Sequence, residues 1–288
     1  SIGVIDGLRI LADALGLSLK DLLGRAERIV HGTTVATNAL LERKGARVGL
    51  LTTEGHRDIL EMREGLKPER YNLRLAPPEA LVPRYLRLGV RQRIDASGAV
   101  RIALNRRSLN RAIAALKAQG VESVAVCYLH SYLDPADERA TRDALATAMP
   151  GIAVSLSSDV LPQIKEFERV STTVVNAYVG PVLERYLTRL AERLAEAGHG
   201  GTLLIMLSHG GVAPVGEAVR LAAGTVLSGP AGGVGGGRHS AKLLGIGDLI
   251  PFDMGGTSTD ISLIVDGQAT LSSNRSVAGE RIALPSLD

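Results

Sequence analysis

Residues 249–267 constrain the fold of this chain more than any other segment. Two apolar segments, 249–252 and 261–265, enclose a turn that reads Asp-Met-Gly-Gly-Thr-Ser-Thr-Asp. Two apolar segments on either side of a short turn predict a β-hairpin. An ordinary hairpin turn requires neither two glycines and three hydroxyls nor an aspartate at each side, so we expect this turn to bind something.

The residue types of this turn suit a phosphate and its metal ion. Glycines leave backbone N–H groups free to close on phosphate oxygens, and hydroxyl groups add further donors. A carboxylate at the end of a strand can orient Mg²⁺ or the waters bound to it. The turn is therefore a candidate phosphate site, and a β-hairpin that merely has a polar tip is the alternative.

A second glycine-rich stretch, residues 227–237, precedes a helical pattern at 238–244. Of the 33 glycines, 17 lie between Gly198 and Gly256, and such clusters usually let a backbone approach a ligand closely. A loop that enters a helix N-terminus offers free N–H groups and the positive end of the helix dipole to an anion. Neither a dinucleotide fingerprint nor a Walker A loop fits, because Arg238 replaces the third glycine and no Gly-Lys pair occurs. The alternative is a tight loop that packs helices together.

A third segment, residues 31–38, reads His-Gly-Thr-Thr-Val-Ala-Thr-Asn between a predicted strand and a predicted helix. Thr33 is a candidate N-cap, and Thr37 and Asn38 fall on the following turn. His31 lies at the carboxyl end of the strand, where open α/β sheets bind their ligands. A structural histidine with satisfied hydrogen bonds is as good an interpretation as a functional one.

The remaining pattern indicates an α/β protein. Residues 28–53 and 109–154 each predict a strand–helix–strand unit, and continuous apolar runs are typical of strands buried on both faces of a sheet. Between them, a segment rich in proline and arginine at 67–83 and a hairpin around 95–98 predict an insertion. Residues 165–197 predict a helix that Gly180 and Pro181 kink or split.

Composition and charge exclude several classes of protein. The single cysteine excludes an internal disulfide, no apolar run reaches the roughly 18 residues of a membrane span, and the first 15 residues carry no secretory signal. A cytoplasmic protein without a membrane partner fits best. The net charge of +3 requires no nucleic acid, and seven arginines between Arg84 and Arg107 are expected to form a solvated hairpin face.

Four motifs together resemble the hydantoinase A/5-oxoprolinase family. They are HGTTVATNALLERKGAR at 31–47, STTVVNA at 171–177, SGPAGG at 228–233 and FDMGGTSTD at 252–260. The resemblance implies the actin-like ATPase fold, in which two RNase-H-like α/β lobes hold ATP and Mg²⁺ in a cleft. It implies a nearly complete first lobe with an inserted β-rich segment and only part of the second lobe, with domains at 1–175 and 176–288.

The resemblance also implies roles for single residues. Asp253 is expected to be a catalytic residue and the carboxylate linked to Mg²⁺ through water. His31, Thr33 and Asn38 are the other candidate catalytic residues, with no acid or base assigned among them. The expected cofactor-binding residues are Gly255, Gly256, Thr257, Ser258, Thr259 and Asp260 of the second phosphate hairpin, and Gly229, Gly232 and Gly233 upstream of it.

Members of this family couple ATP hydrolysis to the opening of a cyclic amide such as a hydantoin or 5-oxoproline, or serve as the ATP-using subunit of ketone carboxylases. We expect the first reaction, through phosphorylation of the amide carbonyl oxygen, with ATP and Mg²⁺ and a hydantoinase B-type second subunit in a hetero-oligomer. A carboxylase subunit acting on a ketone and a non-catalytic nucleotide-gated module are the alternatives. The family's first phosphate hairpin and adenosine-binding stretch are missing from this sequence, so we expect an internal portion of a longer polypeptide that is inactive alone.

Overall fold

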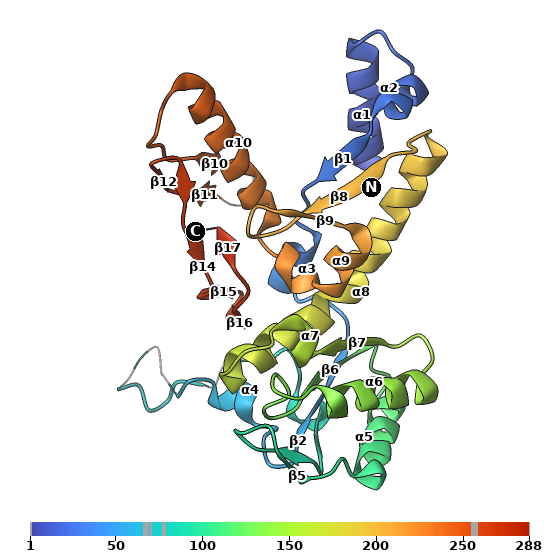
Figure 1. The fold of residues 1–288 in the computed structure, drawn as a ribbon, viewed down its shortest axis with the longest axis vertical. Coiled ribbons are helices and arrows are strands. Elements are labelled where there is room, and N and C mark those ends of the chain that lie inside the picture. The colour runs from blue at the N-terminus through green and yellow to red at the C-terminus, as the bar shows by residue number, and fades with distance from the viewer. Residues whose placement is uncertain (1, 66–68, 70, 77–78, 255–258, 288) are drawn as a thin grey trace. The chain divides into compact units, whose positions relative to one another are not determined.

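The computed structural model describes residues 2–65, 69, 71–76, 79–254 and 259–287, with only the backbone at 259 and 260 (Figure 1). It divides into two compact units. The first comprises Ser1–Asn38, Val182–Ser272 and Pro285–Asp288, and the second comprises Ala39–Pro181 and Ser273–Leu284. Both units are discontinuous in sequence, whereas the expected domain division falls once, after residue 175. That division stays a prediction about the domains of the family.

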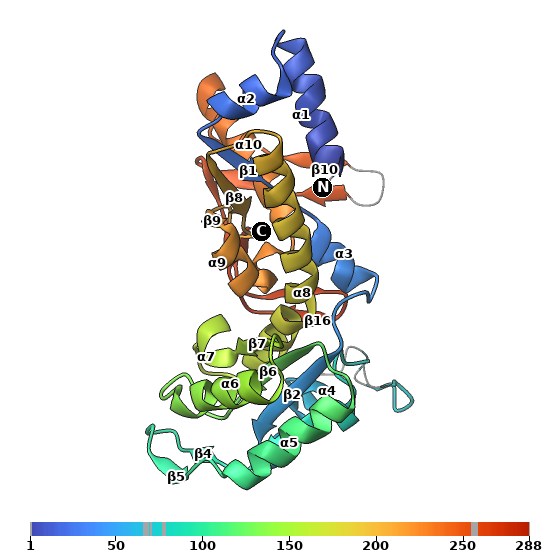
Figure 2. The same ribbon diagram turned by 90° about the vertical axis from the view of Figure 1, so that its right-hand side faces the viewer.

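The core of the second unit is a parallel four-stranded sheet in the order β3-β2-β6-β7. Its strands are β2 (Val48–Thr53), β3 (Arg87–Val90), β6 (Ser123–Cys127) and β7 (Ala153–Leu156). Every residue of β2 and β6 is buried, as expected of apolar runs covered on both faces. Helices α5 (Arg106–Ala118) and α6 (Ala136–Ala148) lie side by side against this sheet (Figure 2). Because α6 connects the parallel neighbours β6 and β7, the strand–helix–strand unit predicted within 109–154 is confirmed.

Shorter elements surround this sheet. They are α4 (Ile59–Met62), the 3-10 helix η1 (Arg84–Leu86), β4 (Arg93–Ile94), β5 (Val100–Ile102) and α7 (Ser157–Val160). Strands β4 and β5 are antiparallel, which confirms the hairpin predicted around residues 95–98. The predicted solvated arginine face is wrong for Arg87, which is 2% exposed. Its Nε donates to Val82 O at 2.7 Å and its Nη2 to Glu61 Oε1 at 3.0 Å, so two of the three guanidinium nitrogens have acceptors.

One long helix, α8 (Glu166–Glu196), contributes to both units and passes from the second to the first at Pro181. The structure keeps one helix with Pro181 inside it, so the predicted break does not split the element. A proline removes one backbone donor from a helix interior and weakens it locally. Residues 171–179 are buried without interruption, and packing on every side of the helix stabilises it up to the proline.

A hairpin from the C-terminal part of the chain completes the second unit. Its antiparallel strands are β15 (Arg275–Val277) and β16 (Glu280–Ile282). Side chains of α8 bind the backbone that leaves this hairpin. Ser171 Oγ donates to Arg281 O at 2.8 Å, and Thr172 Oγ1 accepts from Ala283 N at 3.0 Å. Hydroxyl groups in the core therefore hold a returning segment of chain.

The first unit contains a three-stranded sheet in the order β1-β8-β9. Strand β1 (Arg28–His31) is parallel to β8 (Thr202–Met206), and β9 (Val212–Pro214) is antiparallel to β8. The strand–helix–strand unit predicted at 28–53 is therefore wrong in its pairing. Its helix α3 (Val35–Leu41) and both strands exist, but β1 and β2 belong to different sheets. Local periodicity identifies a strand without identifying a partner that comes much later in the chain.

The first unit also contains several helices besides its part of α8. They are α1 (Ile2–Ala14), α2 (Leu19–Arg25), α9 (Val215–Arg220) and the 3-10 helix η2 (Ala222–Thr225). An apolar cluster centred on Leu23, Leu190 and Leu194 joins α1 and α2 to the last turns of α8. Within the described ranges, none of the helices has the length and apolar character to cross a membrane.

Helix α10 (Ser228–Leu244) contains the glycines that the sequence analysis assigns to a loop. The loop predicted at 227–237 is therefore wrong. Ser228, Ala231, Val234 and Ala241 are buried, and their helical spacing gives the helix one packed face. Burial of that face outweighs the poor helix propensity of glycine, which costs about 1 kcal/mol per residue.

Three short antiparallel pairs follow α10. They are β10 (Phe252–Met254) with β11 (Thr259–Ile261), β12 (Ile264–Val265) with β13 (Gln268–Ala269), and β14 (Leu271–Ser272) with β17 (Ser286–Leu287). The β10–β11 pair, in which Asp253 lies opposite Asp260, confirms the hairpin predicted at 249–267. The predicted phosphate ligands Gly255, Gly256, Thr257 and Ser258 lie outside the described residues. The fold is mixed α/β, as expected.

Candidate functional site

The start of α10 contacts the 31–38 segment within the first unit. Ser228 Oγ donates to Thr33 O at 3.1 Å, and Leu227 N donates to Thr37 Oγ1 at 3.0 Å. Leu227 has a left-handed backbone with φ of 65°, which is uncommon for a leucine. Its hydrogen bond to Thr37 holds this turn in place. Two motifs that are far apart in sequence therefore meet at one helix start.

Asp253 lies beside the same helix start. It lines a hollow of about 170 Å³ whose other walls are Pro230, Gly233, Val234, Pro251, Phe252 and Ser262. Asp253 is exposed, as are its β10 neighbours Phe252 and Met254. The structure thus places Asp253, the residue predicted to be linked to magnesium, beside the first turns of α10.

The three predicted glycine ligands of α10 have different surroundings. A side chain at Gly229 would touch Thr34 Cγ2 at 3.7 Å, and one at Gly232 would touch Met206 Cε at 3.9 Å. At Gly233, a side chain would enter open space. Packing therefore does not account for glycine at position 233, where the bare backbone lines the hollow beside Asp253.

The polar side chains of the 31–38 segment divide into two groups. Thr33 is 7% exposed, and its Oγ1 accepts from Val35 N at 3.3 Å, so it supports the start of α3 much as predicted. Asn38 Nδ2 donates to Thr34 Oγ1 at 3.2 Å, and both residues are exposed. Thr34 and Asn38 can therefore exchange their mutual hydrogen bond for bonds to a ligand, whereas Thr33 cannot do so with its buried hydroxyl.

His31 is held at the carboxyl end of β1. Its Nε2 lies 2.9 Å from Tyr186 OH, and the two rings stack with centroids 5.8 Å apart. Burial lowers the pKa of His31 below its usual value, which favours the neutral imidazole. A neutral imidazole offers one donor and one acceptor. Tyr186 is not among the predicted site residues, because a long-range contact from α8 leaves no local signal in the sequence.

Two sets of predicted residues do not join this arrangement. For Thr259 and Asp260, the structure describes backbone pairing with Met254 and Asp253, so their phosphate contacts stay predictions. The 171–177 motif lies in the second unit, where its hydroxyls bind the unit's own backbone. Sequence resemblance marked this motif without indicating that its role is structural.

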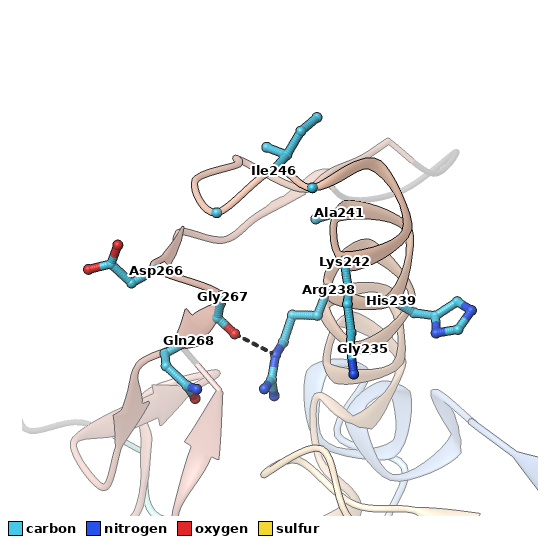
Figure 3. A pocket seen from close by; sticks show the side chains of 11 residues that line it. Gly235, Arg238, His239, Ala241, Lys242, Ile246, Asp266, Gly267 and Gln268 are labelled. Atoms are coloured by element: carbon cyan, nitrogen blue, oxygen red, sulfur yellow. Dashed lines mark hydrogen bonds between the residues drawn. The ribbon is translucent and has the colours of Figure 1, made fainter.

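A second hollow, of about 600 Å³, lies between the later turns of α10 and the β12–β13 turn (Figure 3). Arg238 and Lys242 project into it from one face of the helix, and Arg238 Nε donates to Gly267 O at 3.0 Å. Neither cation is among the predicted site residues, although their spacing of four residues places them on one helix face. Arg238 helps to attach α10 to the hairpin that follows the candidate site.

Sequence comparison identifies relatives over nearly the whole chain. Residues 2–149 match the profile of the hydantoinase/oxoprolinase N-terminal region, and residues 169–288 match the hydantoinase/oxoprolinase profile. The caprolactamase subunit alpha of Pseudomonas jessenii is 37% identical over 99% of this chain and 41% of that protein. The acetophenone carboxylase gamma subunit of Aromatoleum aromaticum is 33% identical over 92% and 38%, and 5-oxoprolinase 1 of Arabidopsis thaliana is 35% identical over 89% and 21%. The chain spans less than half the length of these relatives.

Two solved structures share the fold. Nucleotide-free acetone carboxylase, studied for ATP-dependent acetone carboxylation, superposes with a TM-score of 0.89 at 29% identity, over 100% of this chain and 42% of that one. The ATP-dependent caprolactamase from Pseudomonas jessenii superposes with a TM-score of 0.86 at 36% identity, over 98% and 41%. The likeness therefore extends to amide-opening and carboxylating proteins alike.

Proposed function

Because this chain belongs to the hydantoinase/oxoprolinase family, we propose that it forms part of the ATP site of an enzyme that opens a cyclic amide such as a hydantoin or 5-oxoproline. One observation carries the proposal. The Asp253 carboxylate, the glycine-rich start of α10 and the polar 31–38 segment all converge within the first unit. Relatives named caprolactamase and 5-oxoprolinase support the amide substrate.

The described residues fit a phosphate with its magnesium ion. Asp253 is exposed and forms no ion pair with any residue that the structure describes, so its carboxylate is free to accept a hard cation or its waters. In the first turn of α10, Pro230 has no N–H group and Ala231 N donates to Leu227 O, so the N–H groups of Ser228 and Gly229 are the ones without an acceptor inside the helix, and they favour an anion. The open space beside Gly233 lets a ligand approach the backbone closely. These features support binding of ATP and Mg²⁺.

ATP, when bound, supplies a phosphoryl group for the amide carbonyl oxygen, which gives a stable amide a good leaving group. The residues of this chain would act by position and charge. Asp253 would orient the hydrated Mg²⁺, and the exposed pair Thr34 and Asn38 would hydrogen-bond the reacting groups. Neutral His31 would accept or donate one hydrogen bond, and Thr33 would keep the segment in place.

The wider assignments are proposals of the same kind. We expect two actin-like lobes divided near residue 175, with Gly255, Gly256, Thr257, Ser258, Thr259 and Asp260 gripping the β and γ phosphates. Several relatives are named as subunits, which supports a hetero-oligomer with a hydantoinase B-type partner that completes hydrolysis. A cytoplasmic location is consistent with the use of ATP and a single cysteine.

A second function has an observation in its favour. The structural likeness to acetone carboxylase, at a TM-score of 0.89, supports an ATP-using carboxylase subunit that acts on a ketone. The two chemistries share the phosphate site and differ in the second substrate. A purely nucleotide-gated module would use the same site with no small-molecule substrate.

Replacement of Asp253 by Asn tests the proposal in the full protein with its partner subunit. We expect the release of phosphate stimulated by a hydantoin, 5-oxoproline or a lactam to fall by about 10³-fold, because a neutral amide cannot balance the charge of Mg²⁺. Asp266→Asn is the matched control, since Asp266 is an exposed aspartate on the β12–β13 turn. Stimulation by acetone or acetophenone alone would favour the carboxylase, and turnover indifferent to every amide and ketone would contradict both enzymes.

A further inference from the structure

We infer that Tyr186 is a positioning residue for His31 and that it leaves Nδ1 as the ring nitrogen that contacts the ligand or substrate. The inference deepens the proposed function and rests on it, because it takes His31 to be part of the reacting site. Tyr186 lies on α8, 155 residues from His31, in no motif that the sequence marks.

Two contacts of different kinds define the orientation of the His31 ring. The hydroxyl of Tyr186 lies 2.9 Å from Nε2, which limits rotation of the imidazole about the Cβ–Cγ bond. The rings also stack, with centroids 5.8 Å apart and planes 30° apart, which limits the tilt of the imidazole. Together they restrict the ring more than either contact alone.

Both partners are themselves fixed by regular structure. His31 is the last residue of β1 and lies opposite Ile205 of β8, which is fully buried. The Tyr186 ring packs against the apolar cluster that contains Leu190 and Leu194. A side chain supported by packed elements holds a reacting group more accurately than one on a free loop. Because Tyr186 is itself held by packing, its contact holds the His31 ring in one orientation.

The contact also distinguishes the two ring nitrogens. The hydrogen bond made by one nitrogen of a histidine determines what the other can do. Nε2 is occupied by Tyr186 OH, and Nδ1 has no hydrogen-bond partner among the residues that the structure describes. Nδ1 is therefore the nitrogen left to meet a ligand.

Substitutions at position 31 test which nitrogen works. The amide of Asn occupies approximately the place of Nδ1, and the amide of Gln reaches the place of Nε2. In the full protein with its partner, we expect His31→Asn to keep a kcat about tenfold higher than His31→Gln. Tyr186→Phe should keep the stack, lose the hydroxyl and lower kcat about fivefold to tenfold without changing KM for ATP.

A second readout does not depend on turnover. The rate of deuterium exchange at Cε1 of each histidine follows its protonation state, and His31 is alone among histidines in the tryptic peptide 29–43. Tyr186→Phe should lower the pKa of His31 further, because the imidazolium loses a charge-assisted hydrogen bond that is stronger than the neutral one. His56, in the tryptic peptide 48–57, is the internal control and should not change.

The outcomes separate this inference from the proposed function. The positioning role would be overturned if His31→Asn and His31→Gln lower kcat equally and the pKa of His31 is unchanged in Tyr186→Phe. This holds even if Asp253→Asn abolishes turnover. Unchanged turnover in Asp253→Asn would overturn the proposed function, and a shifted His31 titration would then still support the Tyr186 contact. A lower kcat for Tyr186→Phe with the expected shift supports both.

Discussion

Segments 31–38 and 171–177 are similar in sequence, since each contains adjacent threonines, a valine and an asparagine on a helix or at its start. Their environments differ. Every residue from 171 to 177 is buried, whereas Gly32, Thr34 and Asn38 are exposed. One segment stabilises the second unit, and the other contributes an open polar surface to the first.

The difference lies in where the polar groups find their hydrogen bonds. Thr173 Oγ1 donates to Arg169 O at 2.7 Å and Asn176 Nδ2 donates to Ser155 Oγ at 3.0 Å, both inside the core. A buried polar group that loses its partner costs about 1–3 kcal/mol, whereas an exposed one returns to water. Thr34 and Asn38 can therefore change partners at little cost. Richness in hydroxyls indicates a ligand site only where the hydroxyls are exposed.

Among the changes that compare these two segments, removal of the exposed pair is expected to have the largest effect. The double variant Thr34→Ala/Asn38→Ala should lower amide-stimulated ATP turnover by about 10- to 100-fold, because two hydrogen-bonding groups at the site are lost. The free energy of unfolding should change by less than about 0.5 kcal/mol, as for other exposed positions. Steady-state kinetics and denaturant titration measure the two quantities. Full activity with a large loss of stability would reverse the assignment of the two segments.

In the buried segment, we expect a substitution to lower stability and to leave turnover unchanged. Thr172→Val keeps the shape of the side chain but leaves Ala283 N without its acceptor, and should lower the free energy of unfolding by about 1–3 kcal/mol. Turnover per folded molecule should not change. Thr147→Val is the matched control, because Thr147 is exposed on α6 and its Oγ1 donates to Asp143 O at 2.9 Å. If both variants lose the same stability, burial is not the deciding factor.

The smallest effect on stability is expected at two glycines of α10. A side chain at Gly233 or at Gly236 would enter open space, so alanine at either position should stabilise the helix by about 0.5–1 kcal/mol. Only Gly233 lines the hollow beside Asp253. Gly233→Ala should therefore weaken ATP binding severalfold in calorimetry, while Gly236→Ala should not. Equal affinities would remove Gly233 from the site.

Local patterns were sufficient to predict much of the fold. The buried runs that became β2 and β6 are continuous, as central strands require, and the two apolar segments around the turn between Asp253 and Asp260 predict the β10–β11 hairpin. The helix 165–197 follows from its periodicity. In each case the signal lies within about a dozen residues, so composition and spacing contain it.

Other features depend on contacts that the local sequence does not encode. Strand β1 pairs with β8 rather than with β2. The glycines after Leu227 are helical because burial of one face of α10 outweighs the low helix propensity of glycine. The candidate site shows the same limit. Asp253, His31 and Asn38 could be selected by residue type, but Tyr186 could not, because its role comes only from the position of α8 beside β1.

The hairpin that ends the second unit has a consequence for synthesis of the protein. Thr172 precedes its partner Ala283 by 111 residues. At a translation rate of about 5–20 residues per second, Ser171 and Thr172 are made roughly 5 to 20 s before the backbone that they bind. During that interval the hydroxyls of Ser171 and Thr172 lack the partners that they have in the complete fold. The second unit can therefore begin to fold early on the ribosome, but it acquires its final stability only after most of the first unit has been made.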